Sequence, residues 1–399
     1  MSHPKKKLLF VTQYLQTGGV EKSLLTLLSE LDYDKYEVDL LLFDHSGVLY
    51  KWVPPQVNIL PPLFDTFSEP MSRAVPNLLK TRRLRLLTGK VLASSLAKFS
   101  RGKGVGIRWE VYRRTLPALK QKYDVAISYL DFFCNYYVAE KVRADRKIVY
   151  NHMDYEYSQG QGWPCPRLER RSFRLSDYIV TVAEPARQSL ERNFPEFSGK
   201  MRVIRNRISA ETVRRLALEE GYDDGFEGLR IVTVGRLVAE KGFDFVPEVC
   251  AALARLGLDF RWYLVGSGAL RGELERRAAE LGVTEHLALL GERANPYPFM
   301  AGCDIYVQPS RTEAHCIAVE EALALARPTV VTDIPSFRQQ VQHGETGLIV
   351  PVTEEGLTEG LLRLISSGED RLKLMCRLAG DTAPRYPEEM NKFYQLIEA

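Results

Sequence analysis

The sequence predicts an α/β protein with two doubly wound parallel sheets. Three observations support this class. Short apolar runs rich in β-branched residues alternate with segments of helical periodicity, which is the pattern of a parallel sheet covered by helices. The alternation begins twice, each time with a strand, a glycine-containing loop and a helix. The length of 399 residues also exceeds one ordinary core and is typical of two domains.

The first half opens with a buried strand over residues 7–13, the pair Gly18-Gly19 and a helix over residues 20–31. Further strands are predicted at 36–43, 58–60, 124–129, 147–150, 178–182 and 201–204. We expect these elements to form a Rossmann-like domain over residues 1–205.

The second half repeats this order of elements. The polar stretch from Glu219 to Gly228 is predicted to be a linker. Strands are then predicted at 230–234, 261–265, 286–290, 304–308, 329–332 and 347–350, with helices starting at Gly242 and Ala269. We expect a second Rossmann-like domain over 206–378, and a helix within 379–399 that crosses back to the first domain. Ligands would bind at the carboxyl ends of the strands, in a cleft that both domains face.

Composition limits the compartment and the cofactors. No apolar run approaches the ~20 residues of a transmembrane helix, and the basic N-terminus lacks a signal-peptide pattern. Six scattered cysteines and six dispersed histidines argue against a disulfide framework or a zinc site. Asp32-Tyr-Asp34 lies at the wrong end of the sheet for a ligand, so we interpret it as a turn and not as a metal site. We expect a cytoplasmic protein without a cofactor or metal.

The glycine loops are candidate phosphate-binding sites. Gly18-Gly19 opens a helix, where exposed backbone amides attract an anion and glycine permits its close approach. Arg236 and Lys241 follow the first strand of the second domain. A lysine in the first turn of a helix opposes the helix dipole, so it indicates a bound anion such as a diphosphate.

The loop Gly266-Ser-Gly268 follows the next strand and is expected to line a nucleotide pocket. The third glycine, Gly272, is one place late for a dinucleotide fingerprint. The loop also follows the second strand of its domain, whereas that fingerprint belongs on the first. A dinucleotide-dependent oxidoreductase is therefore not expected.

Two glutamates near the predicted strand 304–308 are candidate ligands of hydroxyl groups. Glu313 lies in the loop after the strand, and Glu321 lies on the next helix. One would hold a sugar and the other a ribose, and Glu320, turned by ~100° on the helix, is a rival for the second role. The helix start would also present the backbone amides of Ala314, His315, Cys316 and Ile317. In the first half, His152 follows the end of a predicted strand and is a further candidate for the functional site.

Together these motifs resemble the retaining GT-B-fold glycosyltransferases of family 4. The resemblance covers most of the chain and is weakest over residues 60–123. Its motifs are Gly18-Gly19-Val-Glu21, Val234-Gly235-Arg236 with Lys241-Gly242, Val265-Gly266-Ser-Gly268, Asn295-Pro-Tyr-Pro298, Pro309-Ser310-Arg-Thr-Glu313 with Glu321-Ala322, and Gly344-Glu-Thr-Gly347.

The resemblance implies how the reaction would proceed. Arg236 and Lys241 would bind the donor diphosphate, and Gly19 would approach it. The sugar would be transferred with retention of configuration, because the departing diphosphate oxygen takes the acceptor proton on the same face. This mechanism needs cations and helix amides on the leaving group, but no carboxylate nucleophile and no metal.

The resemblance also implies that Glu313 contacts the transferred sugar, Glu321 contacts the ribose and His152 lies near the sugar. The form Asn-Pro-Tyr-Pro favours a UDP-sugar of the hexose type. The sequence departs from the family where Glu313-Ala-His315-Cys316 replaces Glu-Gly-aromatic, so we expect His315 to influence which sugar is accepted. Gln339 stands where a glutamate is common.

A basic segment lies within the first half. Fourteen Lys or Arg and one acid occur between Pro70 and Tyr123. Arg82, Arg83 and Arg85 alternate with leucines, as in segments that lie on anionic membranes at about 1 kcal/mol per cation. No nucleic-acid recognition motif accompanies this charge. We expect a peripheral position on the inner face of a membrane and a lipid-linked acceptor, as in polysaccharide or cell-envelope assembly. Ordinary solvated helices are the alternative.

Two other functions stay open. A nucleotide-sugar epimerase of the same architecture would consume the donor without an acceptor. A catalytically silent subunit would bind the donor and support a partner enzyme, which the altered segment at residues 314–316 would fit.

Overall fold

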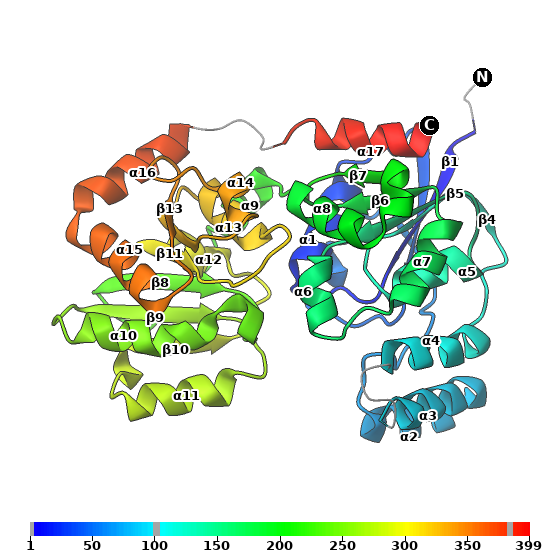
Figure 1. Ribbon diagram of the computed structural model, residues 1–399, viewed down its shortest axis with the longest axis horizontal. Helices are drawn as coiled ribbons and strands as arrows, with labels where there is room; N and C mark the ends of the chain where they lie inside the picture. Colours follow the sequence, from blue (N-terminus) through cyan, green and yellow to red (C-terminus); the bar gives the residue numbers. More distant parts are fainter. Residues whose placement is uncertain (1–3, 99–103, 381–385) are drawn as a thin grey trace. The chain divides into compact units, whose positions relative to one another are not determined.

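The computed structural model describes residues 4–98, 104–380 and 386–399 (Figure 1). The chain divides into two compact units. Unit 1 contains residues 1–206 and 387–399, and unit 2 contains residues 207–386. Each unit is an α/β domain built on a parallel sheet, so the predicted fold class is confirmed.

In unit 1 the strands are β1 (Lys6–Thr12), β2 (Tyr36–Leu42), β3 (Asn58–Ile59), β4 (Lys122–Ser128), β5 (Arg143–Asn151), β6 (Tyr178–Thr181) and β7 (Met201–Val203). The helices are α1 (Gly19–Ser29), α2 (Met71–Lys80), α3 (Leu84–Lys98), α4 (Gly104–Thr115), α5 (Phe133–Lys141), α6 (Tyr155–Gly160), α7 (Pro166–Leu175), α8 (Glu184–Asn193) and α17 (Glu389–Glu398). Short 3-10 helices occur at η1 (Val48–Trp52) and η2 (Pro195–Lys200). In the described part of the chain, these strands form a seven-stranded parallel sheet in the order β3-β2-β1-β4-β5-β6-β7.

Strand β1 lies inside this sheet and is buried on both faces, which explains its nearly continuous apolar run. Leu9 and Val11 belong to the core cluster that also includes residues of α3, α4 and α5. The side chain between them points to the opposite face, because side chains alternate along a strand. There the ring of Phe10 stacks on Phe393 of α17, with ring centroids 6.1 Å apart.

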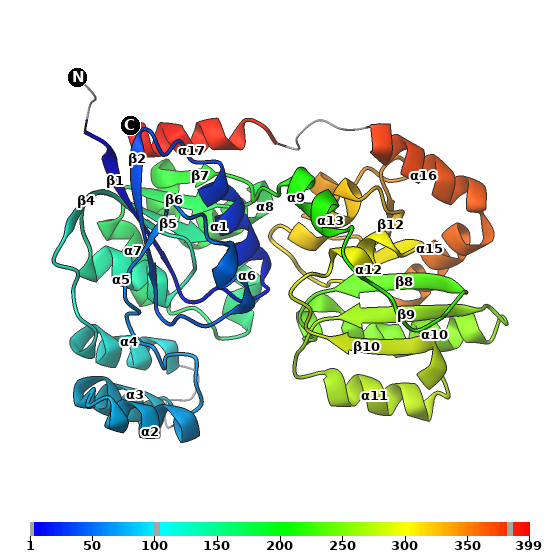
Figure 2. The same cartoon turned by 180° about the vertical axis from the view of Figure 1, so that it is seen from behind.

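Helix α17 belongs to unit 1 although it follows unit 2 in the chain (Figures 1 and 2). The Lys6 amine donates to the carbonyl of Ile397 at 2.9 Å. Arg205 pairs with the buried Glu389 at 3.1 Å. The prediction that the last helix crosses back to the first domain is therefore confirmed.

In unit 2 the strands are β8 (Leu229–Val234), β9 (Phe260–Val265), β10 (Leu287–Gly291), β11 (Ile305–Gln308), β12 (Thr329–Thr332) and β13 (Leu348–Val350). The helices are α9 (Ala210–Leu216), α10 (Val246–Ala254), α11 (Arg271–Glu280), α12 (Tyr297–Ala301), α13 (Ile317–Ala324), α14 (Phe337–Gln340), α15 (Glu354–Ser366) and α16 (Gly368–Gly380). Short 3-10 helices occur at η3 (Ala239–Lys241), η4 (Phe243–Phe245) and η5 (Thr284–His286). Counting only described residues, the sheet has six parallel strands in the order β10-β9-β8-β11-β12-β13.

The two faces of this sheet are covered by different elements. Trp262 and Leu264 of β9 belong to the core cluster that includes residues of α10, α11 and α15. Tyr263 points to the other face, where it meets the ring of Tyr222 with centroids 4.7 Å apart. Helices on both faces bury the parallel strands, as in doubly wound folds.

Two local predictions were wrong. Residues 239–245 form two consecutive 3-10 turns, and the regular helix α10 starts at Val246 and not at Gly242. Gly242 has a left-handed φ of 67°, which ends the first turn, and Pro247 fits the start of the following helix. The stretch from Glu219 to Gly228 is not a free linker, because Asp224 binds Arg261 at 2.9 Å and Tyr263 at 2.5 Å within unit 2.

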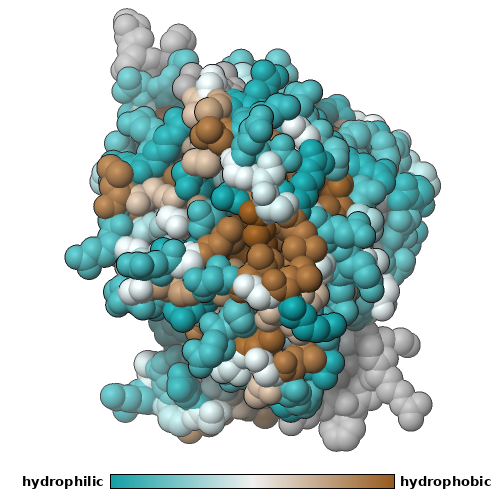
Figure 3. All heavy atoms as spheres, turned by 90° about the vertical axis from the view of Figure 1, so that its left-hand side faces the viewer, coloured by the Kyte–Doolittle hydropathy of each residue, from teal (hydrophilic) through white to brown (hydrophobic). Residues whose placement is uncertain are grey.

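Some apolar side chains remain at the surface. Those in unit 2 include Leu218, Leu256 and Leu372. Figure 3 shows one face on which apolar residues gather near the middle and hydrophilic residues surround them. Within residues 4–98, 104–380 and 386–399, no helix is long and apolar enough to cross a membrane.

Candidate functional site

Lys241 and Glu313 form an ion pair at the carboxyl edge of the unit 2 sheet, after the neighbouring strands β8 and β11. The Lys241 amine donates to Oε1 and Oε2 of Glu313 at 2.6 and 2.7 Å. Burial lowers the pKa of Lys241, but the charge of Glu313, the electrostatic effect of Cys316 and the hydrogen bonds to Glu313 together more than offset this, so the pKa lies above its ordinary value and the amine stays protonated. The structure thus brings together two of the predicted site residues.

A series of hydrogen bonds restrains the Glu313 carboxylate. The hydroxyl of Ser310 donates to Glu313 Oε1 at 2.8 Å. Gln308 donates to the Ser310 oxygen at 3.0 Å, and Tyr306 donates to the Gln308 carbonyl at 2.6 Å. Because each partner is itself held, the carboxylate has one orientation relative to Lys241.

Gly266 and Gly268 allow the loop after β9 to pack against the loop after β8. A Cβ at Gly266, whose φ is +152°, would lie 1.8 Å from the carbonyl oxygen of Gly235. A Cβ at Gly268 would lie 2.3 Å from the carbonyl oxygen of Leu237. The Leu237 amide donates to the carbonyl of Ser267 at 2.9 Å. Packing between the two loops therefore explains why these positions are glycine, independently of any nucleotide.

Arg236 lies in the same loop as Lys241 but outside the ion pair. Its side chain is 72% exposed, and its guanidinium is 3.7 Å from the carboxylate of Glu240. Its charge acts against protonation of Lys241, so the two cations lie near each other. An exposed arginine next to a buried lysine could reach an anion that lies over the loop.

Glu320 and Glu321 are both buried and have different partners. Glu321 accepts a hydrogen bond from the Tyr297 hydroxyl at 2.7 Å. Glu320 accepts one from Gln340 at 2.8 Å and lies 3.8 Å from the ring nitrogen Nε2 of His315. Glu320, the rival for the ribose role, is thus directed toward Gln340 and His315 and not toward Tyr297.

The loop before α13 offers fewer amides than the sequence predicted. The helix starts at Ile317, and its capping residue is Cys316 rather than His315. The Cys316 amide already donates to Gln340 Oε1 at 3.0 Å, while Gln340 Nε2 donates to the Cys316 carbonyl at 2.9 Å. Ala314 is also buried in this loop. In this structure the Cys316 amide is thus bound to Gln340, and its contact with a donor stays a prediction.

The predicted sugar-selecting residue His315 has a buried side chain. Its ring meets the ring of Tyr386 edge to face, with centroids 6.1 Å apart. With Glu320 on its other side, His315 packs inside unit 2.

In unit 1, Gly18 is the capping residue of α1 and Gly19 is its first helical residue. Gly18 itself has no side chain with which to cap the helix. A Cβ at Gly18 would lie 2.1 Å from the Glu21 carboxylate, so the carboxylate lies against this glycine. The first turn of α1 thus places an acid of the same motif next to the backbone of the helix start.

His152 follows β5 at the carboxyl edge of the unit 1 sheet. Its ring stacks on Tyr150 with centroids 5.5 Å apart and an interplanar angle of 16°, and it lies 5.3 Å from the Tyr129 ring. Burial lowers the pKa of His152 to about 3, and an interaction with the Tyr129 backbone opposes part of this change. The imidazole is therefore neutral near pH 7. Within the described chain, neither ring nitrogen makes a hydrogen bond of good geometry.

The basic segment forms α2, α3 and α4. Arg82 is exposed and has a left-handed φ of 56° at the turn between α2 and α3. Arg83 pairs with Asp65 at 3.1 Å, and Arg85 donates to the carbonyl of Arg114. Lys90 is buried, and its amine donates to the carbonyls of Thr66, Phe67 and Glu69. Lys90, which the sequence placed among the surface cations, therefore holds a loop.

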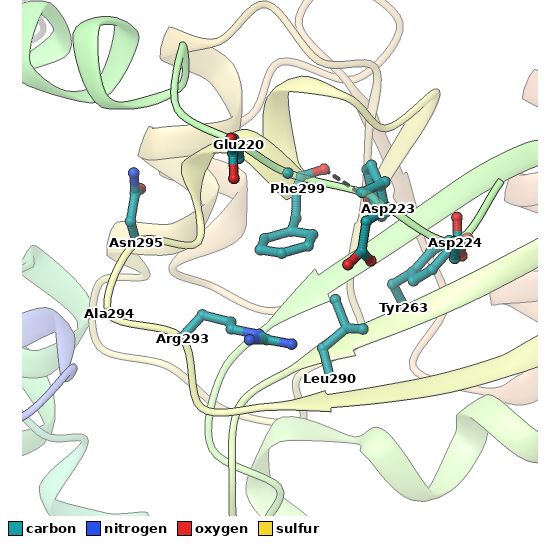
Figure 4. Close-up of a pocket in the computed structure, with 11 residues that line it drawn as sticks. Glu220, Asp223, Asp224, Tyr263, Leu290, Arg293, Ala294, Asn295 and Phe299 are labelled. Atoms are coloured by element: carbon teal, nitrogen blue, oxygen red, sulfur yellow. Dashed lines mark hydrogen bonds between the residues drawn. The ribbon is translucent and has the colours of Figure 1, made fainter. Parts of the chain in front are cut away.

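A cavity of about 290 Å³ lies elsewhere in unit 2, beside the segment that was predicted to be a linker. In Figure 4 the ring of Phe299, the carboxylate of Asp223 and the guanidinium of Arg293 point into it. Its lining residues are Glu220, Gly221, Tyr222, Asp223, Asp224, Tyr263, Leu290, Arg293, Ala294, Asn295 and Phe299. None of them is a predicted catalytic or donor-binding residue.

No group of three or more His, Cys, Asp or Glu side chains suited to a metal ion occurs in the described parts of both units. Asp32 and Asp34 form a turn, in which Asp32 accepts the Asp34 amide at 3.1 Å and pairs with Lys35 at 3.0 Å. All six cysteines are free thiols.

Comparison with known families identifies the second unit. The family model described as "Glycosyl transferases group 1" matches residues 227–376, which include Lys241, Glu313 and Glu321. Over these residues, the chain is similar to the glycosyl transferases group 1 family. The suspected resemblance is thus confirmed.

Two curated proteins illustrate what this chain is similar to. The alpha-D-kanosaminyltransferase of Streptomyces kanamyceticus is 29% identical over 227 residues, which cover 54% of this chain and 57% of that protein. The N-acetylgalactosamine-N,N'-diacetylbacillosaminyl-diphospho-undecaprenol 4-alpha-N-acetylgalactosaminyltransferase of Campylobacter jejuni is 31% identical over 201 residues, covering 50% and 53%. The chain thus spans a little over half the length of the curated relatives it matches.

Solved structures cover more of the chain. Anabaena HepE in complex with UDP and glucose matches 99% of this chain and 100% of its own, with a TM-score of 0.69 and 15% identity. At this identity the likeness shows the fold, which is GT-B. The group 1 match covers part of unit 2, whereas the likeness to the GT-B fold covers both units.

Sequence reasoning missed three residues near the predicted sites. Ser310 was seen as part of a motif, but its bond to Glu313 could not be read from spacing. Gln340 lies next to the noted Gln339 and binds the Cys316 backbone. Asp131 is an acid within the aromatic run Tyr129-Leu-Asp-Phe-Phe133, and this contrast was the signal that could have found it.

Proposed function

We propose that this chain is a retaining glycosyltransferase. It would move a hexose-type sugar from a nucleotide diphosphate sugar, with UDP as the favoured nucleotide, to a lipid-linked acceptor of polysaccharide or cell-envelope assembly. The observation that supports this most is the Lys241–Glu313 pair at the carboxyl edge of β8 and β11, inside the region that matches the group 1 family.

The pair suits a reaction in which a diphosphate leaves. Lys241 is a protonated and mostly buried cation, so its charge acts on a leaving anion with little screening. The exposed Arg236 would add a guanidinium that closes on the diphosphate after the donor binds. Glu313, fixed by Ser310, would accept hydroxyls of the transferred sugar, and the departing phosphate oxygen would take the acceptor proton on the same face.

The remaining assignments follow from contacts. Glu321, rather than Glu320, would hold the ribose, because Glu320 is directed toward Gln340 and His315. In unit 1 the neutral imidazole of His152 would lie near the sugar, and the backbone amides at the start of α1, at Gly18-Gly19, would face the phosphates. Two cations and these amides would neutralise the diphosphate without a metal.

A membrane surface is the proposed location, on the cytoplasmic side. Helix α3 exposes Leu84, Val91, Leu92 and Leu96, which are 39–59% exposed and lie on one face at helical spacing. Exposed cations flank this face, among them Arg82. An apolar face beside cations suits a layer with anionic headgroups and apolar chains. The undecaprenol-linked acceptor named for the Campylobacter relative supports a lipid-linked acceptor here.

The test is incubation of the purified protein with UDP-, GDP- and ADP-sugars, with and without a membrane lipid extract. A new glycolipid that forms only with the extract would support the proposal. A changed sugar nucleotide without any acceptor would identify an epimerase instead. Donor binding without turnover under every condition would identify a silent subunit.

A further inference from the structure

Asp131 is a buried acid that the proposed mechanism does not use. It follows β4 at the carboxyl edge of the unit 1 sheet, beside β5 and His152. Only 7% of the residue is exposed. Both of its carboxylate oxygens lie 3.2 Å from the backbone nitrogen of His152, which donates to them. In the part of the chain that the structure describes, its carboxylate has no ion pair.

The backbone next to Asp131 is strained. Phe132 has φ = 60° and ψ = −111°, although it is neither glycine nor asparagine. A bulky aromatic residue rarely adopts a positive φ, and such a conformation persists only where the surrounding structure imposes it. Phe132 turns the chain from β4 into α5, and this turn directs the preceding side chain inward toward the His152 backbone.

The buried position is unfavourable for a carboxylate. Burial raises the pKa of Asp131 to about 7, and hydrogen bonds from the His152 amide and from its own backbone offset only part of this effect. A strained turn and a buried acid without a cation both reduce stability. Both are therefore expected where function requires one fixed arrangement.

The contacts around Asp131 restrain His152. The ring packs against both Tyr129 and Tyr150, whose own ring centroids lie 4.5 Å apart, and its backbone amide is held by Asp131. With the ring and the amide both restrained, the imidazole nitrogens have one direction. No described side chain competes for them with good geometry.

We propose that Asp131 is a positioning residue of the reaction and acts through His152. Its carboxylate binds the His152 amide and so keeps the neutral imidazole oriented toward the sugar. This inference rests on the proposed function, because it assumes that His152 serves the transfer.

The test is a double-mutant cycle. Asp131→Leu removes the acceptor oxygens and keeps the branching at the γ-carbon, Asp131→Asn keeps one acceptor oxygen, and both are made with His152 and with His152→Ala. We expect Asp131→Leu to lower kcat about tenfold or more with the donor KM changed less than about twofold, and Asp131→Asn to restore most of the rate. With His152→Ala present, Asp131→Leu should change kcat by less than about twofold. An equal loss in both backgrounds would overturn the proposal.

Asp39→Asn is the matched control, since Asp39 is an equally buried acid of unit 1 that binds Tyr123 and not His152. It should leave kcat unchanged. If Asp131→Leu does not fold, Asp131→Ala provides the same comparison.

A second measurement separates this inference from the proposed function. The imidazole signals of His152 in an NMR spectrum, assigned with His152→Ala, should shift in Asp131→Leu and much less in Asp131→Asn. This result does not require turnover. If the wild type transfers no sugar, the proposed function fails while these signals still test the positioning. If the signals are the same in all variants, the positioning is wrong.

Discussion

The amine of Lys241 lies within 2.7 Å of both carboxylate oxygens of Glu313. The two residues are 72 positions apart in the chain and follow adjacent strands of one sheet. Neither charge can be removed without leaving the other in a mostly buried site. The pair therefore links stability and the proposed catalysis.

Lys241→Ala should lower kcat/KM at least about a hundredfold, because one preorganised charge on a leaving anion contributes ~3 kcal/mol. It should also lower the melting temperature, since an unpaired buried carboxylate is destabilising. Arg236→Ala should lower kcat/KM similarly but keep the melting temperature, because Arg236 is largely exposed. Lys373→Ala, an exposed lysine of unit 2, is the control. Unchanged turnover in both site variants would contradict the diphosphate assignment.

Substitutions of Glu313, Glu321 and Glu320 should change kcat and the donor KM in different ways. Glu313→Gln should abolish transfer, since its contact with the sugar changes in the transition state. Glu321→Gln should mainly raise the donor KM, because a ribose contact is the same in both states. Glu320→Gln should change both constants little, as Glu320 faces Gln340 and His315. Steady-state rates over a range of donor concentrations decide this, and equal losses in kcat for Glu313→Gln and Glu321→Gln would refute the division.

Turnover should persist in excess EDTA. Lys241, Arg236 and helix amides would neutralise the diphosphate, so no divalent cation is required. Initial rates are compared before and after treatment with EDTA and after addition of Mg²⁺ or Mn²⁺. A loss that either ion restores would show that the reaction uses a metal.

The contribution of Glu169 to the free energy of unfolding should decrease as the pH rises. Burial raises the pKa of Glu169 to about 8 from 4.5, although the Tyr136 hydroxyl donates to the carboxylate and opposes the change. Between these values the folded state binds a proton that the unfolded state has released, so the free energy of unfolding decreases as the pH rises through this window. The melting temperature should fall from pH 5 to pH 8.5, and Glu169→Gln should reduce that fall. An identical fall in both proteins would contradict the assignment.

Vesicles containing phosphatidylglycerol should sediment the protein, whereas neutral vesicles should not. The binding should weaken with salt, because the Debye length falls from ~10 Å at 0.1 M to ~3 Å at 1 M. Replacing Leu84, Leu92 and Leu96 by serine should abolish it without changing donor binding. Leu256→Ser, at a similarly exposed leucine of unit 2, is the control. If the wild-type protein stays in the supernatant at low salt, the exposed side chains of α3 contact only solvent and the membrane proposal is wrong.

Replacing Arg82, Arg83 and Arg85 together by glutamate is a less direct test than replacing these leucines. Arg83 already pairs with Asp65, and Arg85 binds the Arg114 carbonyl. Glutamates at these positions would disturb packing as well as surface charge.

The sequence predicted the parallel sheets well, because buried strands and glycine loops have strong local patterns. It placed the regular helix after Lys241 several residues too early, since the left-handed turn at Gly242 depends on close packing against the Pro309 carbonyl. That contact joins residues 67 positions apart by number, and no local pattern reports it.

The candidate site was predictable in its residue types but not in its contacts. Lys241 and Glu313 were both expected, yet their direct pairing depends on how two loops meet. The sequence could not decide between Glu320 and Glu321, because their difference lies in Tyr297 and Gln340, which belong to other elements. Asp131 was missed because its significance depends on the strained Phe132 and on the His152 amide.

The return of α17 to unit 1 has a consequence for how the chain is made. Phe393 covers Phe10, and the Lys6 amine binds the Ile397 carbonyl, so strand β1 has its full set of neighbours only when α17 is present. All of unit 2 is synthesised between these two segments. Unit 2 is continuous in sequence and can fold as it emerges from the ribosome, whereas unit 1, although it emerges first, is completed last.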